Sequence, residues 1–108
     1  MTTVGLDDFK KLDLRIALVR KVEAHPNADR LYVITVEIGG EERVIVAGIR
    51  NYYGPEDLLN KKVVVITNIL PSVIRGVESN GMLLAVKDSS TLAVLTPERD
   101  VATGSPVS

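Results

Sequence analysis

Two adjacent glycines between two extended segments constrain the fold of this chain more than any other feature. Residues 31–38 place apolar side chains at every second position, a period that is typical of a strand with one buried face. Residues 42–47 form a second extended segment. Gly39 and Gly40 lie between the two, and glycine adopts the positive φ angles of a two-residue hairpin turn without strain. The sequence therefore predicts an antiparallel hairpin from these two segments.

The composition indicates that the rest of the core is also built from strands. Hydrophobic residues make up 45% of the 108 residues, yet there is only one Phe, three Tyr and no Trp, so the core must be aliphatic. β-branched residues at this density favour strands over helices. The length is typical of one domain with one hydrophobic core, and we expect residues 1–108 to form a single domain.

The remaining strands are expected to bend around a barrel. Residues 13–24 predict a long strand with a bulge near residues 19–20, because Val19 and Val22 fall out of phase. The β-branched run over residues 62–69 predicts a strand that is buried on both faces. Further elements are expected as helical turns over residues 6–12 and 55–59 and as strands over residues 82–86 and 92–95. The predicted fold class is all-β: an OB-fold five-stranded barrel with short helices, an N-terminal helical turn and a C-terminal extension that packs on the barrel.

The composition also excludes several classes of chemistry. Without cysteine the chain has no disulfide, no thiol nucleophile and no Cys-ligated metal, and its single histidine does not make a conventional multi-His zinc site. That histidine, His25, precedes Pro26 and is interpreted as a loop residue that enters a turn. The acidic residues stand in turn-like or helix-start positions. We therefore predict a non-catalytic binding domain with no cofactor and no metal.

Membrane insertion is not indicated by the hydrophobic pattern. No apolar run approaches the ~20 residues that are needed to cross a bilayer. No segment has the charged, apolar and small-residue regions of a signal peptide. We therefore expect a cytoplasmic protein without a membrane partner.

The segment over residues 79–85 carries the strongest indication of function. It begins with polar donors and a glycine, and Met82 then opens an apolar run. Gly81 permits a tight turn or the close approach of a ligand. The methionine side chain is flexible and polarizable enough to lie against a flat ring. Taken alone, the segment is better explained as an ordinary glycine-containing turn between two strands, and the motifs that accompany it favour a functional role.

Other motifs accompany this segment in a characteristic order. They occupy residues 8–16, 25–32, 46–49, 51–53 and 55–58. In order and spacing they resemble the tRNA-binding domain found at the C-terminus of many methionyl-tRNA synthetases, from about residue 6 to residue 107. The same domain occurs in free-standing tRNA-binding proteins, in endothelial-monocyte-activating polypeptide and in a branch described as secretion chaperones.

The resemblance implies that the domain binds tRNA by shape and backbone rather than by sequence. In the family a basic residue at the position of Arg30 is assigned to tRNA contact, and the Ser-x-Gly-Met motif borders the same surface. Arg43 faces away from the buried side of its expected strand, although a solvated surface position is the alternative for both arginines. The complete set of expected tRNA-binding residues is Arg30, Arg43, Asn68, Arg75, Ser79, Gly81, Met82 and Lys87.

The charge balance limits the strength of the binding that we expect. Thirteen basic and fourteen acidic residues give a net charge of -1, whereas a strong nucleic-acid binder usually carries a basic excess. The two signs cluster in different parts of the sequence, so they are compatible with separate faces. Ala47 stands where relatives commonly have serine, which removes one donor near the site. We therefore predict weak tRNA binding with a steep dependence on salt.

Three functions are compatible with these observations. The first is tRNA binding as an accessory subunit in trans, or as the C-terminal domain, of methionyl-tRNA synthetase. The match of both ends to the family's free-standing members favours a free-standing homodimer, with apolar residues of the terminal segments at the interface. The alternatives are a secretion-chaperone-like protein that binds peptide in the same groove, and a dimerisation module of a larger synthetase. A groove lined by arginine and lysine would favour tRNA, and an apolar groove led by Met82 and Tyr52 would favour peptide.

Overall fold

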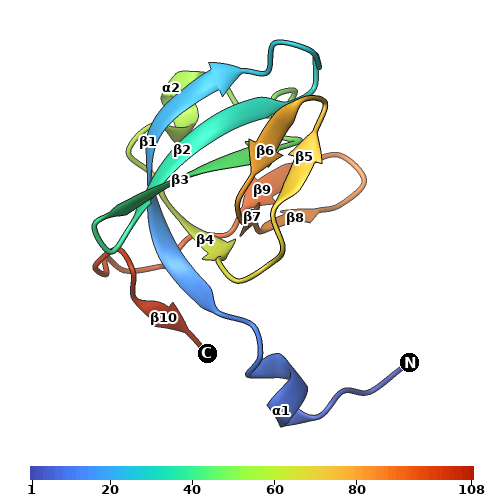
Figure 1. The fold of residues 1–108 in the computed structure, drawn as a ribbon, viewed down its shortest axis with the longest axis vertical. Helices are drawn as coiled ribbons and strands as arrows, with labels where there is room; N and C mark the ends of the chain where they lie inside the picture. The colour runs from blue at the N-terminus through green and yellow to red at the C-terminus, as the bar shows by residue number, and fades with distance from the viewer.

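The computed structural model describes residues 1–108, and its longest strand, β1 (Leu14–Ala24), lies at the centre of a curled antiparallel sheet (Figure 1). The other elements are α1 (Leu6–Phe9), β2 (Tyr32–Ile38), β3 (Glu41–Ala47), α2 (Pro55–Leu58), β4 (Lys62–Ile66), β5 (Ser72–Ile74), β6 (Val77–Ser79), β7 (Met82–Leu83), β8 (Ala85–Lys87), β9 (Leu92–Val94) and β10 (Pro106–Val107). The order across the sheet is β3-β2-β1-β4-β7, and β10 also pairs with β1. The curled sheet confirms the predicted OB-like barrel, with α2 between its third and fourth strands.

A bulge in β1 allows one strand to serve both sides of the barrel. The first half of β1 pairs with β4, from Leu14 to Leu18, and the second half pairs with β2 up to Ala24. The register with β2 shifts between Val19 and Lys21, which confirms the predicted irregularity. Because a bulge bends its strand and increases the local twist, the sheet curls at this point.

The β2–β3 hairpin forms as the sequence predicts. Gly39 and Gly40 have φ angles of 59° and 91°, which only glycine adopts readily. The register runs from Ile38 opposite Glu41 to Tyr32 opposite Ala47.

The interior of the barrel is aliphatic apart from one tyrosine. The main buried cluster consists of Ala17, Val19, Tyr32, Ile34, Val36, Ile45, Ile49, Leu58, Val63, Val65 and Val94. A smaller cluster of Leu14, Ile16 and Val64 lies on the opposite face of β1 and β4. Consecutive valines of β4 therefore belong to different clusters, which confirms that this strand is buried on both faces.

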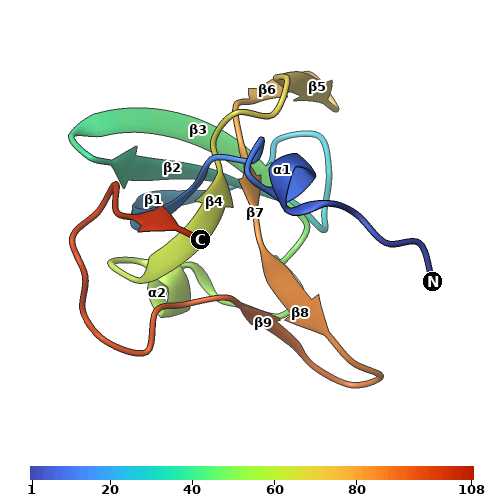
Figure 2. The same ribbon diagram turned by 90° about the horizontal axis from the view of Figure 1, so that it is seen from below.

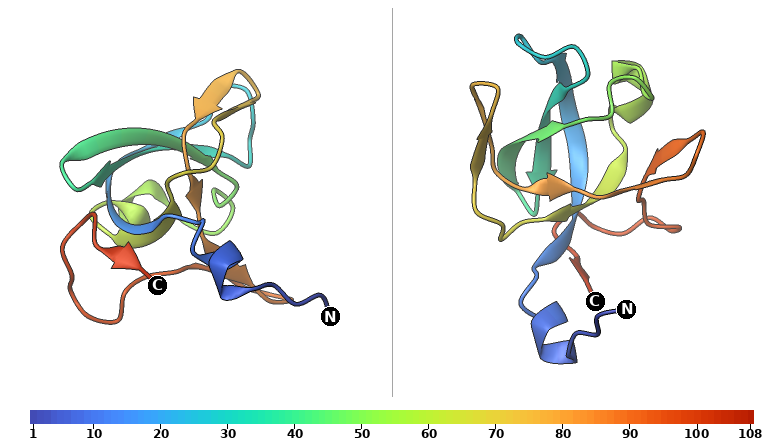
Figure 3. Two further views of the ribbon diagram at one scale, coloured as in Figure 1. Left: turned by 60° about the horizontal axis from the view of Figure 1, so that its bottom comes forward. Right: turned by 90° about the vertical axis from the view of Figure 1, so that its right-hand side faces the viewer.

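The chain departs from the sequence prediction after β4. That strand ends at Ile66 rather than at residue 69, and both Ile69 and Leu70 are exposed. Pro71 follows and lacks the N–H that a central strand needs. An unpredicted hairpin, β5–β6, comes next and projects from the barrel (Figure 3). The apolar run over residues 82–86 is also not one strand, because β7 pairs with β4 whereas β8 pairs with β9.

The barrel closes where residues 79–80 meet β3. The Asn80 N–H donates to the Val44 carbonyl oxygen at 2.8 Å, and the Val46 N–H donates to Ser79 Oγ at 2.9 Å. One serine hydroxyl therefore takes the place of a backbone carbonyl in the seam between two strands.

The two terminal segments differ in how they are held. Helix α1 is a single turn without a buried residue, within the one or two turns expected, and it lies below the barrel in Figure 1. The chain before it runs away from the rest of the molecule toward the N-terminus (Figure 2). The C-terminal extension packs as predicted, because β10 pairs with β1 and the Gly104 N–H donates to the Ile16 carbonyl at 2.7 Å. No helix is both long and apolar enough to span a membrane.

Candidate nucleic-acid interface

An apolar groove of about 460 Å³ lies beside the Ser-x-Gly-Met motif. Ten of its fourteen lining residues are hydrophobic. The lining residues come from the end of β3 (Val46, Ala47, Gly48, Ile49), from the segment around β5 (Ile69, Leu70, Ser72, Ile74) and from the motif and its continuation (Ser79, Gly81, Met82, Leu83, Leu84, Ala85). The groove thus gathers side chains that the sequence alone placed in unrelated segments. Ile69 was missed because β4 was expected to continue to residue 69, although Pro71 indicates that the strand ends earlier. Leu70 and Ile74 were missed because the β5–β6 hairpin was not predicted.

Two members of the motif shape the wall of this groove. Ser79 is only 4% exposed, and its hydroxyl is occupied by the Val46 N–H and by the Gly81 carbonyl at 3.3 Å. Gly81 has a φ of 135°, and a Cβ there would lie 3.2 Å from the Ile66 carbonyl oxygen. Only glycine fits this position without strain. The hydroxyl of Ser79 and the absent side chain of Gly81 therefore fix the backbone from which the next residue projects.

Met82 is the member of the motif whose side chain is available to a ligand. It is 44% exposed and lies at the edge of the groove. Its thioether chain adapts to flat or irregular apolar surfaces, including the faces of bases. The motif therefore presents one flexible apolar side chain on a rigid, glycine-dependent turn.

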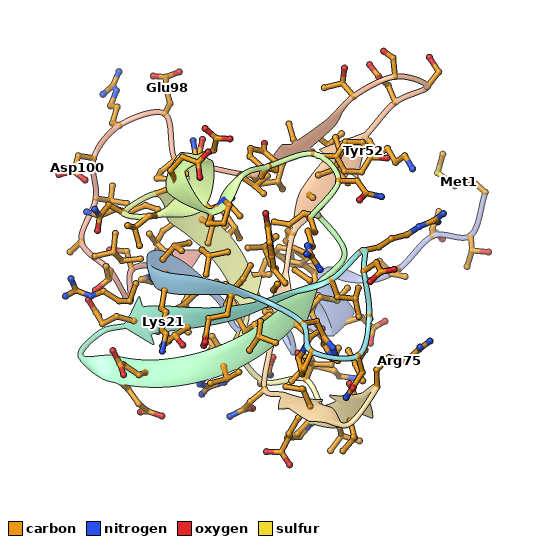
Figure 4. All side chains as sticks on the ribbon, turned by 90° about the horizontal axis from the view of Figure 1, so that it is seen from above. Met1, Lys21, Tyr52, Arg75, Glu98 and Asp100 are labelled. Atoms are coloured by element: carbon orange, nitrogen blue, oxygen red, sulfur yellow. The ribbon has the colours of Figure 1, made fainter.

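Arg30 and Arg75 lie together around a second hollow, of about 430 Å³, at the tip of the β5–β6 hairpin. Arg75 stands in the hairpin turn with a φ of 53°, and its side chain points away from the barrel (Figure 4). Its Nη2 donates to the Asn27 carbonyl at 3.1 Å, and Asn27 Nδ2 donates to the Arg75 carbonyl at the same distance. These reciprocal bonds join the loop before β2 to the hairpin, and no pattern in the sequence indicates them.

The hollow and the groove are neighbours. Ile74 lines the groove and precedes Arg75 directly. Leu31 lines the hollow, and its Cδ2 lies 3.6 Å from the position of a Cβ built on Gly48, which lines the groove. The hollow that Arg30 and Arg75 line therefore adjoins the apolar groove.

Arg43 belongs to a different cluster. It donates to the Thr67 carbonyl and lines a small hollow with Asp13 and Arg15. The Thr67 hydroxyl at 2.6 Å, followed by the Arg15 guanidinium at 2.8 Å, holds the pKa of Asp13 below its usual value. Arg43 is thus bonded within the fold and is accompanied by a carboxylate, which weakens its attraction for phosphate.

The last two expected residues are also engaged within the chain. Asn68 Oδ1 accepts the Asp13 N–H at 2.8 Å, and Asn68 Nδ2 donates to the Lys11 carbonyl at 2.6 Å, so the side chain ties down the segment after α1. The Lys87 ammonium lies 5.6 Å from the ring centroid of Tyr52, a cation–π distance. The eight expected residues therefore occupy several separate places, of which the Arg30–Arg75 hollow and the Met82 groove adjoin.

Comparison with known proteins identifies the family of this fold. Residues 14–106 match the family model described as "Putative tRNA binding domain". The methionine–tRNA ligase of Pyrococcus furiosus is 50% identical over 107 residues, which are 99% of this chain and 15% of that protein. The chain thus spans about a seventh of the length of that curated relative.

Solved structures agree with this assignment. The crystal structure of a MetRS-related protein from Pyrococcus horikoshii superposes with a TM-score of 0.92 at 32% identity, covering 99% of both chains. The crystal structure of chaperone CsaA from Bacillus anthracis has a TM-score of 0.88 at 27% identity, covering 99% of this chain and all of the other. The family model thus matches most of the sequence, and both solved structures share the fold. The chain belongs to the tRNA-binding domain family.

Proposed function

We propose that this domain binds tRNA on the surface formed by the Arg30–Arg75 hollow and the adjoining Met82 groove. The observation that carries the proposal is this adjacency, in a chain of the tRNA-binding domain family. The two guanidinium groups suit phosphate oxygens, and Met82 with the apolar groove suits the face of an unstacked base. Such a surface reads backbone and shape rather than sequence.

The small number of cations determines how this binding depends on salt. Each phosphate contact releases condensed counterions, so affinity falls steeply as salt concentration rises. Two arginines in a chain of net charge -1 supply a weak but salt-sensitive attraction. Electrophoretic mobility shifts with bulk tRNA at ~50 mM and ~200 mM salt test this expectation. Absence of binding at the lower salt, or equal affinity at both, would contradict the proposal.

A double variant locates the surface. We expect Arg30→Ala combined with Arg75→Ala to weaken tRNA binding by about tenfold or more and to lower the salt slope by about two. Arg99→Ala is the control, because it removes one exposed arginine, and its effect is compared with half of the effect of the double variant on a logarithmic scale. Its neighbour Glu98 lies on the opposite side of the molecule from Arg75 in Figure 4. Equal losses per arginine in the double variant and the control would refute the location.

A second candidate function is peptide binding. The observation that favours it is the apolar character of the groove, which fits the side chains of an extended peptide better than phosphate. The chaperone CsaA has the same fold. Fluorescence anisotropy of labelled apolar peptides, with tRNA as competitor, distinguishes the two. Peptide affinity that is unchanged by salt and lost in Met82→Asp would favour this function.

We also propose that two copies of the chain associate and that the assembly works beside methionyl-tRNA synthetase in the cytoplasm. Helix α1 and its flanks expose Val4, Leu6, Phe9 and Leu12, which make an apolar surface that the barrel does not cover. Light scattering at micromolar concentration should give about twice 11.7 kDa, and Leu6→Ser with Phe9→Ser should reduce it to 11.7 kDa. A monomer in the unmodified protein would refute the pairing. Co-purification with methionyl-tRNA synthetase tests whether the chain works beside that enzyme as an accessory subunit. Covalent linkage to the synthetase would instead make the chain one of its domains.

A further inference from the structure

We infer that His25 is a positioning residue that holds the β5–β6 hairpin against the loop before β2 and so sets the place of Arg75 relative to Arg30. The inference rests on the proposed function, because it concerns the same two arginines. It starts from the one buried histidine of the chain, which is 4% exposed and which neither the groove nor the barrel core uses.

Both ring nitrogens of His25 are occupied, and their partners assign the tautomer. The Asn27 N–H donates to Nδ1 at 3.0 Å, so Nδ1 carries no proton. Nε2 lies 2.9 Å from the Ile74 carbonyl oxygen, which only accepts, so Nε2 carries the proton. The neutral Nε2–H form satisfies both contacts at once. One nitrogen faces the loop that leads to Arg30, and the other faces the residue before Arg75.

The hairpin needs such a clamp because its own strands do not fix its tip. Strands β5 and β6 have three residues each and form a sheet of their own. An isolated two-stranded hairpin is marginally stable in water. At the base, the Ser79 hydroxyl joins the hairpin to β3. At the tip, the hydrogen bonds across to the loop come from His25 to Ile74 and from Asn27 to Arg75 in both directions.

The backbone conformation of Arg75 is a second reason why the hairpin tip needs contacts from outside the hairpin. Arg75 has a φ of 53°, a conformation that is uncommon for a residue other than glycine. Surrounding contacts must hold an arginine in this conformation, and the bonds from His25 and Asn27 do so on both sides of its peptide unit. Without the imidazole, only the Asn27–Arg75 bonds join the tip to the loop, and Asn27 itself loses the Nδ1 acceptor for its N–H, so the spacing of the two guanidinium groups is less fixed.

Two conservative variants separate the two halves of the clamp. His25→Gln places an amide NH₂ near the position of Nε2 and keeps a donor for the Ile74 carbonyl. His25→Asn places an amide oxygen near the position of Nδ1 and keeps an acceptor for the Asn27 N–H, but it does not reach Ile74. His25→Leu removes both contacts at similar volume. If the histidine positions the hairpin, the Gln variant should recover function that the Leu and Asn variants lose.

The measurements are tRNA affinity at two salt concentrations and the amide NMR signal of Gly76, which reports the hairpin tip without tRNA. We expect His25→Leu to bind about fivefold more weakly with a salt slope lower by about one, the change expected for the loss of one phosphate contact, and to shift the Gly76 signal. His25→Gln should restore at least half of the affinity, on a logarithmic scale. The imidazole ¹H–¹⁵N correlation of the unmodified protein should show the Nε2–H tautomer.

Several results would overturn the inference. These are an Nδ1–H tautomer, unmodified affinity and slope in His25→Leu, or a Gln variant that recovers no more than the Asn variant. If His25→Leu does not fold, the Gln and Asn pair decides alone. Failure of the proposed function looks different, because the double arginine variant would then bind tRNA as the unmodified protein does while the Gly76 signal still responds to His25.

Discussion

Replacing Ser79 with alanine tests whether this member of the motif supports the fold rather than contacting a ligand. The substitution removes the hydroxyl that accepts the Val46 N–H and donates to the Gly81 carbonyl. The Val46 N–H then has no hydrogen-bond partner in the seam between β3 and residues 79–80. Ser79 itself is only 4% exposed, so water does not readily replace the hydroxyl. An unsatisfied donor in such a place costs about 1–2 kcal/mol.

The expected change in melting temperature follows from the size of the domain. For a chain of 108 residues, about 1 kcal/mol corresponds to roughly 4 °C, so Ser79→Ala should melt ~4–8 °C lower. Circular dichroism or differential scanning calorimetry measures it. Ser89→Ala is the matched control, because Ser89 is exposed in the turn between β8 and β9 and should change the melting temperature by less than about 2 °C.

One combination of results would refute this reasoning. If Ser79→Ala melts with the unmodified protein but no longer binds tRNA, the hydroxyl acts on the ligand and not on the seam. We expect the reverse: Ser79→Ala should lower the melting temperature. Its tRNA affinity, measured well below that temperature, should fall less than the affinity of Met82→Ala.

Three further predictions concern the groove and its surroundings. Met82→Ala should weaken tRNA binding severalfold while costing less than about 1 kcal/mol of stability, because the side chain is 44% exposed; a loss of ~2–5 kcal/mol by chemical denaturation would instead make it a core residue. Gly81→Ala should cost more than about 1 kcal/mol, since φ is 135° and the new Cβ would meet the Ile66 carbonyl oxygen, whereas Gly5→Ala, with open space around it, should be near neutral in the same assay. The pKa of Asp13 is lowered by the Thr67 hydroxyl and then by Arg15, so its stabilisation is present above the usual value of 3.8 and is lost as pH falls below it. Asp13→Asn should therefore lose less stability than the unmodified protein between about pH 6 and about pH 3, and equal losses would contradict the assignment.

Some of the site could be read from the sequence, because the relevant chemistry is local. The Ser-x-Gly-Met motif was recognised from its own four residues, and Met82 is exposed as a contact residue requires. Arg30 and Arg75 were both expected at the surface, but not beside each other. The polar atoms of Ser79 and Asn68 bond to distant backbone groups, which the sequence did not indicate, and their contact with tRNA stays a prediction. A polar side chain gives no sign in the sequence of whether its partner is a ligand or the chain itself.

The sequence by itself determined the elements whose cause lies within a few residues. Gly39 and Gly40 specify a turn through their own φ angles, and the phase change after Val19 specifies a bulge. Pro55 begins a helix because its own φ suits the first turn. These signals needed no knowledge of the rest of the molecule.

The tertiary structure decided which distant segments meet. The run over residues 82–86 divides because its two halves find different partner strands, and no local pattern encodes that choice. The contacts of His25 with Ile74 and of Asn68 with Lys11 join residues 49 and 57 positions apart. Hydrogen bonds and side-chain packing act over a few ångströms, so such pairs exist only after the barrel has closed and brought them within reach.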